Sequence, residues 1–402
     1  MATPETIPSY NPFDPSQVDH HDEVLAQIRH ACPVAEVQPG LFYVSRHEEI
    51  LEVCRQPKLY RQGLFHRADE IDPTPEHLHL GETNPPEHTA VRKALSSGLS
   101  VKRVKTYEPT IAKICEDIAA RLAQKDTAEL IEDIGVPLPG SVIGFVAGFP
   151  AEFQGQLRQY SDDYMVMGTE GVDPQELAAA TARVAEFDDR IREVIAERRS
   201  QSDRPNDLMT ALIEAVDGEG RLLSDEKVLT HLTKDVLVGG TETTTHLIGN
   251  LFFQLLSTEG LYERVRNDRS LVPTAIEESL RQLPPVQILF RIPAEDTELA
   301  GTAIPAGSTV GLGYSSANRD ESIFHDPDKF DLDRGEEVRQ HLGFGWGIHL
   351  CVGAPLARME ARLMLDAVLD HVPSMRLAPG YTYERVPFIL FRAPRRLDVI
   401  LG

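Results

Sequence analysis

Apolar residues recur at three-and-four spacing along residues 224–256, and this long helical pattern constrains the fold more than any other feature of the chain. Ser224 is a suitable N-cap, and Asp225 and Glu226 in the first turn complement the helix dipole. At 1.5 Å per residue such a helix spans roughly 48 Å, enough to cross a whole domain. The same spacing predicts further helices at 104–122, 174–198, 273–283 and 355–372. We therefore expect a mainly α fold organised around one long helix.

Patterns typical of β-strands are short and few. They occur at 41–44, 287–292, 308–312 and around 397–400, and they predict a small β portion beside the helical body. A length of 402 residues suggests two or three domains by size alone. However, we find no internal repeat, low-complexity tract or interdomain linker. We therefore expect residues 1–402 to form a single domain.

The charge of the chain excludes some classes of partner. Its 63 acidic and 40 basic residues give a formal net charge of −23, which argues against binding to nucleic acid or to an anionic membrane. The most apolar long segment is too polar to span a bilayer, because it is interrupted by Glu242, His246, Asn250 and Gln254. The amino terminus lacks the pattern of a signal peptide, and the four cysteines are scattered singly. We therefore expect a cytoplasmic protein without a membrane anchor.

Inside the long helical pattern, residues 238–245 read Val-Gly-Gly-Thr-Glu-Thr-Thr-Thr, which is a poor helical sequence. Each glycine costs about 1 kcal/mol relative to alanine in a helix, and the β-branched threonines add to this cost. Such conflicts are expected at functional sites, and Glu242 and Thr243 supply an acid and a hydroxyl here. The alternative is a helix kink whose threonine hydroxyls bond to carbonyls one turn earlier. The segment alone leaves both interpretations open.

A glycine-rich loop near the carboxyl end contains a single cysteine, Cys351, and leads directly into a predicted helix. Loop amides and a helix amino terminus both favour a deprotonated sulfur. One cysteine without further ligands at zinc spacing argues against zinc, and favours a metal carried by a macrocycle, such as heme with a thiolate axial ligand. The alternative, a buried free cysteine, fits Cys32, Cys54 and Cys115.

This loop resembles the heme-binding signature of the cytochrome P-450 superfamily, Phe-Gly-x-Gly-x-His-x-Cys-x-Gly. Every specified position is filled, by Phe344, Gly345, Gly347, His349, Cys351 and Gly353. Further segments resemble family motifs in the expected order, at 84–92, 239–244, 278–281 and 317–334. The resemblance thus covers residues 84–353 through motifs. It implies the cytochrome P-450 fold, a helical body with a long central helix and small β-sheets, and heme b (iron protoporphyrin IX) as the cofactor.

The resemblance also implies roles for the residues that bind heme. Cys351 would be the thiolate ligand of the iron, and Phe344 would pack beside its sulfur. The two propionates need cationic or hydrogen-bonding partners, which by resemblance are His88, Arg92, Arg291 and His349.

In the central helix, the resemblance places Gly239 and Gly240 over the distal heme face, where they leave room for dioxygen. Thr243 would hydrogen-bond the oxygen that is being activated, and Glu242 would relay protons to it from solvent. The presence of both an acid and an alcohol favours a monooxygenase.

Glu278 and Arg281 lie three residues apart on one face of a short predicted helix, a spacing suited to an ion pair. By resemblance this pair stabilises the following meander and takes no part in the chemistry. The family commonly adds a third residue to the pair. Lys329 and Arg334 are both candidates, and the sequence does not choose between them.

A run without acidic residues, from 88 to 107, is unusual in so acidic a chain and contains Lys102, Arg103 and Lys105. The resemblance implies that an acidic ferredoxin docks on a basic surface, and Arg358 occupies a family position associated with that docking. The alternative is a helix end that happens to be basic.

The substrate pocket is expected to draw on the variable segments 60–83 and 160–174. It should also include five apolar residues at family pocket positions, Val286, Ile288, Leu289, Phe388 and Ile389, which favour a hydrophobic organic molecule. Asp235 shares a helix face with Gly239 and Thr243. We expect Asp235 either to meet a polar group of the substrate or to form a salt bridge with a neighbouring helix.

Together these features predict a monooxygenase that inserts one oxygen atom from O2 into a hydrophobic substrate. Its electrons would come from NAD(P)H through a ferredoxin reductase and a ferredoxin. Two alternatives are a heme-thiolate peroxygenase or isomerase on the same fold, and a heme-binding sensor or carrier without catalysis. The sequence identifies neither the substrate, nor the ferredoxin, nor the oligomeric state.

Overall fold

The computed structural model describes residues 10–11, 21–62, 75–169 and 171–402. The chain divides into two compact units, which are described separately. The first contains Met1–Arg67, Ser270–Cys351 and Glu384–Arg395, and the second contains Ala68–Arg269, Val352–Tyr383 and Arg396–Gly402. Helices predominate and the sheets are small, which confirms the expected mainly α fold. The single-domain organisation stays a prediction.

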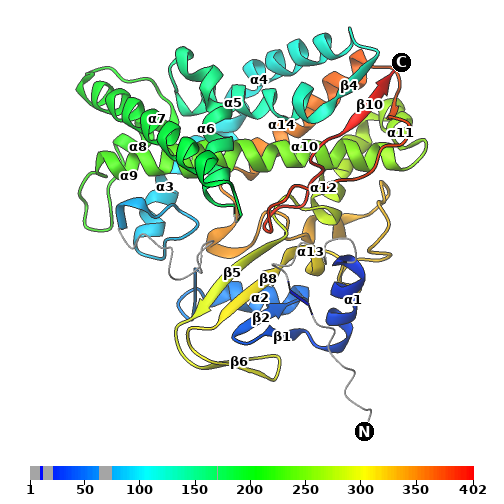
Figure 1. Ribbon diagram of the computed structural model, residues 1–402, viewed down its shortest axis with the longest axis horizontal. Helices are drawn as coiled ribbons and strands as arrows, with labels where there is room; N and C mark the ends of the chain where they lie inside the picture. Colours follow the sequence, from blue (N-terminus) through cyan, green and yellow to red (C-terminus); the bar gives the residue numbers. More distant parts are fainter. Residues whose placement is uncertain (1–9, 12–20, 63–74, 170) are drawn as a thin grey trace. The chain divides into compact units, whose positions relative to one another are not determined.

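The first unit is built on a five-stranded sheet (Figure 1). Its strands, in spatial order, are β1 (Val34–Gln38), β2 (Leu41–Val44), β8 (Thr309–Gly313), β5 (Ile288–Pro293) and β3 (Tyr60–Gln62). β2 and β8 pair in parallel, with Phe42 opposite Val310, and all the other pairs are antiparallel. The predicted strands at 41–44, 287–292 and 308–312 correspond to β2, β5 and β8 to within one residue at each end.

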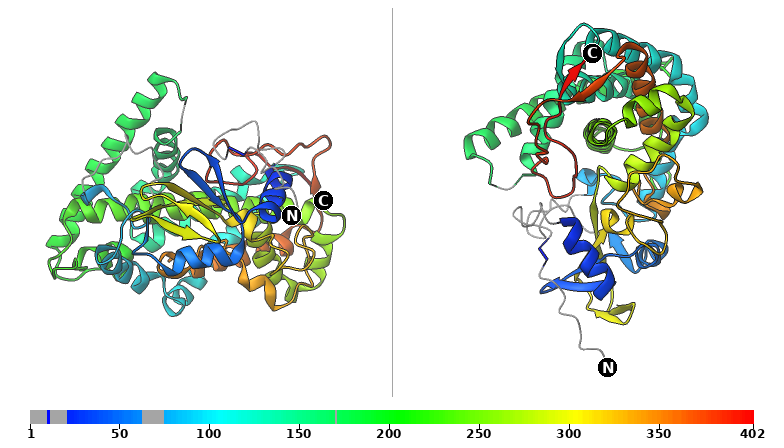
Figure 2. Two further views of the ribbon diagram at one scale, coloured as in Figure 1. Left: turned by 90° about the horizontal axis from the view of Figure 1, so that it is seen from below. Right: turned by 90° about the vertical axis from the view of Figure 1, so that its right-hand side faces the viewer.

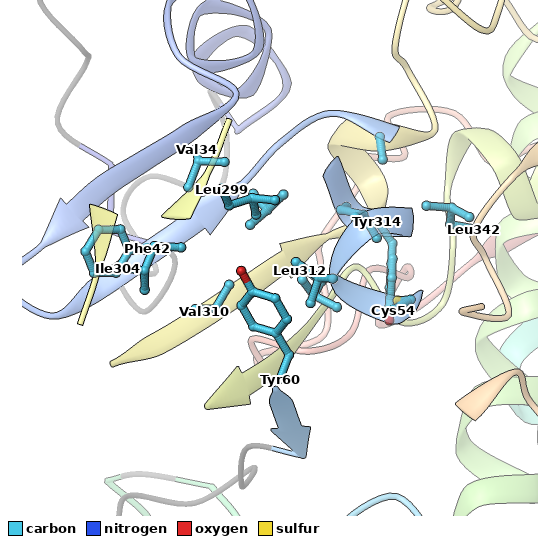
Figure 3. Packing of buried hydrophobic residues seen from close by; sticks show 14 residues of the cluster. Val34, Phe42, Cys54, Tyr60, Leu299, Ile304, Val310, Leu312, Tyr314 and Leu342 are labelled. Carbon is cyan, nitrogen blue, oxygen red and sulfur yellow. The ribbon is translucent and has the colours of Figure 1, made fainter. Parts of the chain in front are cut away.

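Apolar residues on the two faces of this sheet belong to two hydrophobic clusters. On one face, Phe42, Val310 and Leu312 pack with Tyr60 and with the helix α2 (His47–Arg55), as Figure 3 shows. On the other face, Ile288 and Phe290 pack with the helix α1 (His21–Ala31). The strands are therefore covered on both sides, in agreement with their apolar sequences.

Shorter elements complete the first unit. They are the hairpin β6 (Thr297–Leu299) and β7 (Thr302–Ile304), the helices α12 (Val272–Gln282) and α13 (Tyr314–Ala317), and the short 3-10 helices η7 (Glu336–Gln340) and η8 (Gly347–His349). The sequence predicts α12 as 273–283, one residue from the observed bounds.

The second unit is helical with one small sheet. Its longer helices are α3 (Glu87–Leu99), α4 (Val101–Leu122), α5 (Pro137–Ala147), α6 (Gln154–Met167), α7 (Pro174–Ser200), α10 (Gly239–Ser257) and α14 (Ala354–His371). The sheet has the order β4 (Thr127–Glu129), β10 (Asp398–Leu401) and β9 (Met375–Leu377). In the right-hand view of Figure 2, α10 is seen end-on. No helix among the described residues is long and apolar enough to cross a membrane.

The long helical pattern at 224–256 is one continuous helical run with a change of hydrogen-bond register in its middle. It consists of α9 (Asp225–Thr230), the π-helix η5 (His231–Val238) and α10. Ser224 caps it as expected, because its hydroxyl accepts a hydrogen bond from the Lys227 N–H. Gly239, the first residue of α10, donates its N–H to the Lys234 carbonyl five residues earlier. The π-helix ends where the glycine-threonine segment begins, and π-helical turns are frequent at functional sites.

Candidate functional site

The Cys351 loop lies in the first unit and is shaped by glycines in tight turns. Gly345 and Gly347 have φ angles of 69° and 72°, in the left-handed region that favours glycine. The Cys351 N–H donates to the Phe344 carbonyl at 2.9 Å and closes the loop. Cys351 is exposed, whereas the other three cysteines are buried or half-buried. The loop therefore presents one accessible thiol, which is the donor that a thiolate-ligated heme iron requires.

Phe344 and His349, the other side chains named from this loop, are both half-buried. The ring centroid of Phe344 lies 6.2 Å from that of His341. His341 is itself buried, and its Nε2 is hydrogen-bonded to Glu277 Oε2 at 2.9 Å. His349 lies in η8, two residues before Cys351. The predicted contacts of Phe344 and His349 with heme stay predictions.

Arg291 in β5 is a buried cation. Only 4% of its surface is exposed, and its Nη1 donates to the Phe290 carbonyl at 2.8 Å. Among the described residues it forms no ion pair with a carboxylate. A buried charge is stable only when it is paired. Arg291 thus fits an anionic group such as a heme propionate.

Glu278 in α12 lies at the centre of a buried ionic network. Its carboxylate accepts hydrogen bonds from Arg281 at 2.7 and 2.9 Å and from Arg334 at 2.9 and 3.0 Å. Glu278 and Arg281 are fully buried, and only 2% of the Arg334 side chain is exposed. Arg334 therefore completes the predicted pair. The side chain of Lys329 is 63% exposed and pairs with Asp331 instead.

Arg281 also ties α12 to the segment that follows α13. Its guanidinium donates to three carbonyl oxygens, those of Asn318, Pro327 and Lys329, at 2.7 to 3.1 Å. All of its polar groups are used in these bonds and in the pair with Glu278, which matches the structural role expected of this motif.

The predicted heme contacts of the second unit are in α3. His88 is buried and Arg92, one helical turn later, is half-buried. Burial and the charge of Arg92 lower the pKa of His88 to about 4. His88 is therefore a neutral imidazole near pH 7, which can donate one hydrogen bond but carries no charge.

The two glycines of α10 differ in their surroundings. Gly239 is exposed. Gly240 packs against α5, because a Cβ atom there would lie only 2.5 Å from Ile143 Cδ1. The sequence predicts that both glycines leave room for dioxygen. Close packing of two helices is itself sufficient reason for a glycine at position 240.

The threonines of α10 bond to the helix backbone. Thr243 Oγ1 donates to the Gly239 carbonyl at 2.7 Å, and Thr241 Oγ1 donates to the Leu237 carbonyl at 2.8 Å. These are the bonds expected if the threonine hydroxyls of this segment bind carbonyls one helical turn earlier. They leave the lone pairs of Thr243 Oγ1 able to accept a further hydrogen bond.

Glu242 contacts a neighbouring helix rather than a charged partner. Its Oε1 lies 2.7 Å from the hydroxyl of Ser161 in α6, and the same hydroxyl lies 2.9 Å from Thr241 Oγ1. Burial raises the pKa of the Glu242 carboxyl above its ordinary value. Nothing near Glu242 in the sequence indicates Ser161, which is some eighty residues away.

Asp235 lies in η5 and is held by three groups. It is 2.7 Å from His231 Nδ1 and 3.3 Å from His79 Nδ1, and the Leu80 N–H donates to both of its oxygens at 3.0 Å. Although burial opposes this, the two histidines hold the pKa of Asp235 well below its usual range. The carboxylate is thus paired, but with its own helix and a loop rather than with a neighbouring helix. A substrate contact stays a prediction.

The basic residues at the start of α4 are not equivalent. Lys102 and Lys105 are exposed. Arg103 donates to the Tyr107 hydroxyl at 2.9 Å and to the Asn206 carbonyl. Arg358 in α14 is half-buried. The exposed cations of the predicted docking surface are therefore the two lysines.

The expected pocket residues do not share one environment. Leu289 packs against the cluster of Phe42 and Val310, whereas Ile288 is 3% exposed and packs with α1 in the other cluster. Successive side chains of a strand point to opposite faces, so Ile288 and Leu289 cannot line the same wall. The pocket roles expected of Ile288 and Leu289 therefore both stay predictions. Val286 is half-buried, and Phe388 and Ile389 are partly buried against the cluster that contains Ile288. In the variable segments, residues 63–74 and 170 lie outside the described residues.

Comparison with known proteins gives concordant results. The family model for cytochrome P450 matches residues 171–372. A steroid C26-monooxygenase of Mycobacterium tuberculosis is 35% identical over 346 residues, which cover 86% of this chain and 90% of the relative. Cytochrome P450 107B1 of Saccharopolyspora erythraea is 33% identical over the whole of both chains. The solved structure of cytochrome P450 CYP109Q5 from Chondromyces apiculatus matches with a TM-score of 0.85 at 30% identity, covering 98% of each chain. The chain therefore belongs to the cytochrome P450 family and is a monooxygenase with heme b as its cofactor.

Proposed function

We propose that this cytochrome P450 hydroxylates a hydrophobic organic molecule, using O2 and two electrons from NAD(P)H delivered by a ferredoxin reductase and a ferredoxin. The observation that carries the proposal is the pairing of Glu242 with Thr243 in α10, directly after a π-helix. An ionisable group and an adjacent hydroxyl are what general-acid delivery of protons requires. The proposal treats residues 1–402 as one heme-thiolate domain that works in the cytoplasm.

When bound, heme b supplies the activation of O2. In the first unit, Cys351 would be the thiolate ligand, and Arg291 and His349 would pair with propionates. In the second unit, His88 and Arg92 would have the same role. The buried position of Arg291 and the exposed Cys351 thiol support this assignment.

The residues of α10 would control protons and water. Thr243 Oγ1 already donates its own proton to the Gly239 carbonyl, so it is oriented to accept a hydrogen bond. Glu242 would hold a proton at its carboxyl and give it to Thr243 Oγ1, which would release its own hydroxyl proton in the same step. Gly239 would leave the helix backbone open to a ligand at this point.

The substrate is proposed to be a large apolar molecule with few polar groups. Phe388 and Ile389, which pack against the same cluster, supply apolar surface, and Asp235 is already paired with two histidines. One relative is a steroid C26-monooxygenase, so steroids are a reasonable first class to screen. Binding would be detected as a shift in the heme spin state.

The proposed donor is an acidic ferredoxin, because Lys102 and Lys105 form an exposed basic surface in a chain of net charge −23. Arg358 would contribute to the same docking. Reversing both lysines to glutamate should slow reduction by ferredoxin and weaken its salt dependence. Reversal of Lys113, an exposed lysine later in α4, is the matched control. Equal effects of the two reversals would contradict the assignment.

The function itself is tested by comparing electron sources and by Thr243→Ala. The wild-type enzyme should form hydroxylated product with NAD(P)H, ferredoxin and reductase, and peroxide alone should support much less turnover. Thr243→Ala should consume NAD(P)H at a similar rate but form less product per electron pair. Efficient turnover with peroxide alone, or unchanged coupling in Thr243→Ala, would refute the proposal.

A further inference from the structure

Ser161 is placed between two side chains of α10. It is fully buried in α6, and its hydroxyl oxygen lies 2.7 Å from Glu242 Oε1 and 2.9 Å from Thr241 Oγ1. Thr241 Oγ1 in turn lies 2.8 Å from the Leu237 carbonyl oxygen. The four groups therefore form one chain of three hydrogen bonds, which ends at a backbone oxygen that can only accept.

Counting protons fixes the direction of this chain. Each hydroxyl has one proton, and a carbonyl oxygen has none. Because Leu237 can only accept, Thr241 spends its proton there, and Ser161 must then donate to Thr241. The bond between Ser161 and Glu242 therefore needs a proton from the carboxyl group. If Glu242 were ionised, Ser161 would donate to it, and no proton would remain for one of the other two short contacts.

The surrounding charges are compatible with a neutral carboxyl. Asp162 and Arg158, both in α6, are the charged groups that act on Glu242, and they pair with each other at 2.6 Å. Arg158 also pairs with Glu132 at 3.2 Å, so its charge is already balanced. The helix α5, which also packs against α10, contains no ionisable side chain. Burial and, to a smaller extent, the charge of Asp162 raise the pKa of Glu242 in this setting.

We propose that Ser161 and Thr241 are positioning residues that hold Glu242 in its protonated form, so that the acid is loaded with a proton before it acts. This inference rests on the proposed role of Glu242 in proton delivery and adds two residues to it. Neither hydroxyl touches substrate or heme in the proposal. They act by accepting and passing on the hydrogen bond that the protonated carboxyl donates.

The experiment is an infrared pH titration of the holoenzyme. A protonated carboxyl has its own C=O stretching band, and the difference between the wild type and Glu242→Gln assigns the band of Glu242. The titration is repeated for Thr241→Val and Ser161→Ala. Thr245→Val is the matched control, because Thr245 is one turn further along α10 and its hydroxyl bonds to the Gly135 carbonyl at 2.9 Å.

The two positioning variants should behave differently. In Thr241→Val, Ser161 has lost its acceptor and turns to donate to Glu242, which stabilises the ionised form. The midpoint should fall by about one to two pH units, as expected for one hydrogen bond to a charged group. In Ser161→Ala the ionised carboxylate has no donor, so the band should persist at neutral pH. Thr245→Val should leave the midpoint unchanged.

A band absent from the wild type at pH 7, or a midpoint in Thr241→Val that is unchanged or higher, would overturn the inference. A general loosening of the helices would shift the Glu242 midpoint equally in Thr241→Val and Thr245→Val, and equal shifts would also overturn the inference. The titration needs neither substrate nor ferredoxin. If the band behaves as expected while Thr243→Ala leaves coupling unchanged, the inference stands and the proposed proton delivery fails.

Discussion

Replacing Glu278 by glutamine tests how much the buried ionic network of the first unit contributes to stability. The substitution keeps the shape of the side chain but removes its negative charge. It also replaces one acceptor oxygen by an NH2 group, which would face the N–H groups of Arg281 or Arg334. Among the described residues, Arg281 would then have no carboxylate as ion-pair partner, and Arg334 would keep only Glu337, at 2.8 Å.

The expected loss follows from the burial of all three groups. Breaking a buried ion pair by removing one partner costs about 3–5 kcal/mol, because an uncompensated charge stays buried. Unfolding has an entropy of about 2.1 cal/mol/K per residue, which gives about 0.8 kcal/mol/K for 402 residues. The melting temperature should therefore fall by about 4–6 °C.

Thermal unfolding of the holoenzyme, followed by circular dichroism, measures this shift. Lys329→Met is the matched control from the same network segment, since its ion pair with Asp331 is exposed and should contribute less than about 1 kcal/mol. A melting temperature of Glu278→Gln within 1 °C of the wild type would refute the reasoning. So would an equal loss in Lys329→Met, because that lysine would then be part of the network.

Three further predictions concern other parts of the molecule. The losses in free energy of unfolding caused by Gly240→Ala and Ile143→Val, measured with denaturant, should be coupled by about 1 kcal/mol. The new methyl would lie 2.5 Å from Ile143 Cδ1, an atom that valine lacks, so the second substitution relieves the clash. Additive losses would contradict this. Burial lowers the pKa of His79, but the nearby carboxylates, chiefly that of Asp235, outweigh it and raise the pKa above 6.5. Protonated His79 therefore stabilises the fold below pH 6.5, and this contribution disappears as the pH rises through the raised pKa. His79→Gln should therefore lower the free energy of unfolding at pH 6 more than at pH 8.5, and an equal loss at both values would exclude the ion pair. Arg291→Gln should lower the heme content at limiting heme, measured from the Soret absorbance, without changing the far-ultraviolet circular dichroism; full heme content would contradict its role.

Much of the fold is predictable because apolar periodicity depends directly on which face of an element is buried. The spacing at 273–283 and 355–372 predicts α12 and α14 to within one residue at each end. The π-helix η5 was not predicted, because a change from α to π register alters backbone hydrogen bonds and leaves the apolar pattern of residues 231–238 nearly the same.

The candidate site is predictable where its residues are close in sequence. The Glu278–Arg281 pair follows from a spacing of three, and its third member required the structure because Lys329 and Arg334 are both long cations in one segment. His231 is four residues before Asp235, and this helical spacing is itself the sequence signal for a His–Asp pair. The contact of Ser161 with Glu242 has no such signal in the sequence, because it depends on how α6 packs against α10.

Alternation along β5 separates Ile288 and Phe290 from Leu289, which places two expected pocket residues on opposite faces of the strand. The sequence predicts this separation. It does not predict which face lines a pocket, because that depends on what packs against each side.

The proposed chemistry depends on Cys351 as the thiolate ligand of the heme iron. This role is tested by the absorption spectrum of the reduced protein after addition of carbon monoxide, recorded for the wild type and for Cys351→Ala. A thiolate ligand gives a strongly red-shifted Soret band in this complex. We expect that band in the wild type and its loss in Cys351→Ala. A wild-type spectrum without the red shift, or a red-shifted band that survives in Cys351→Ala, would contradict it.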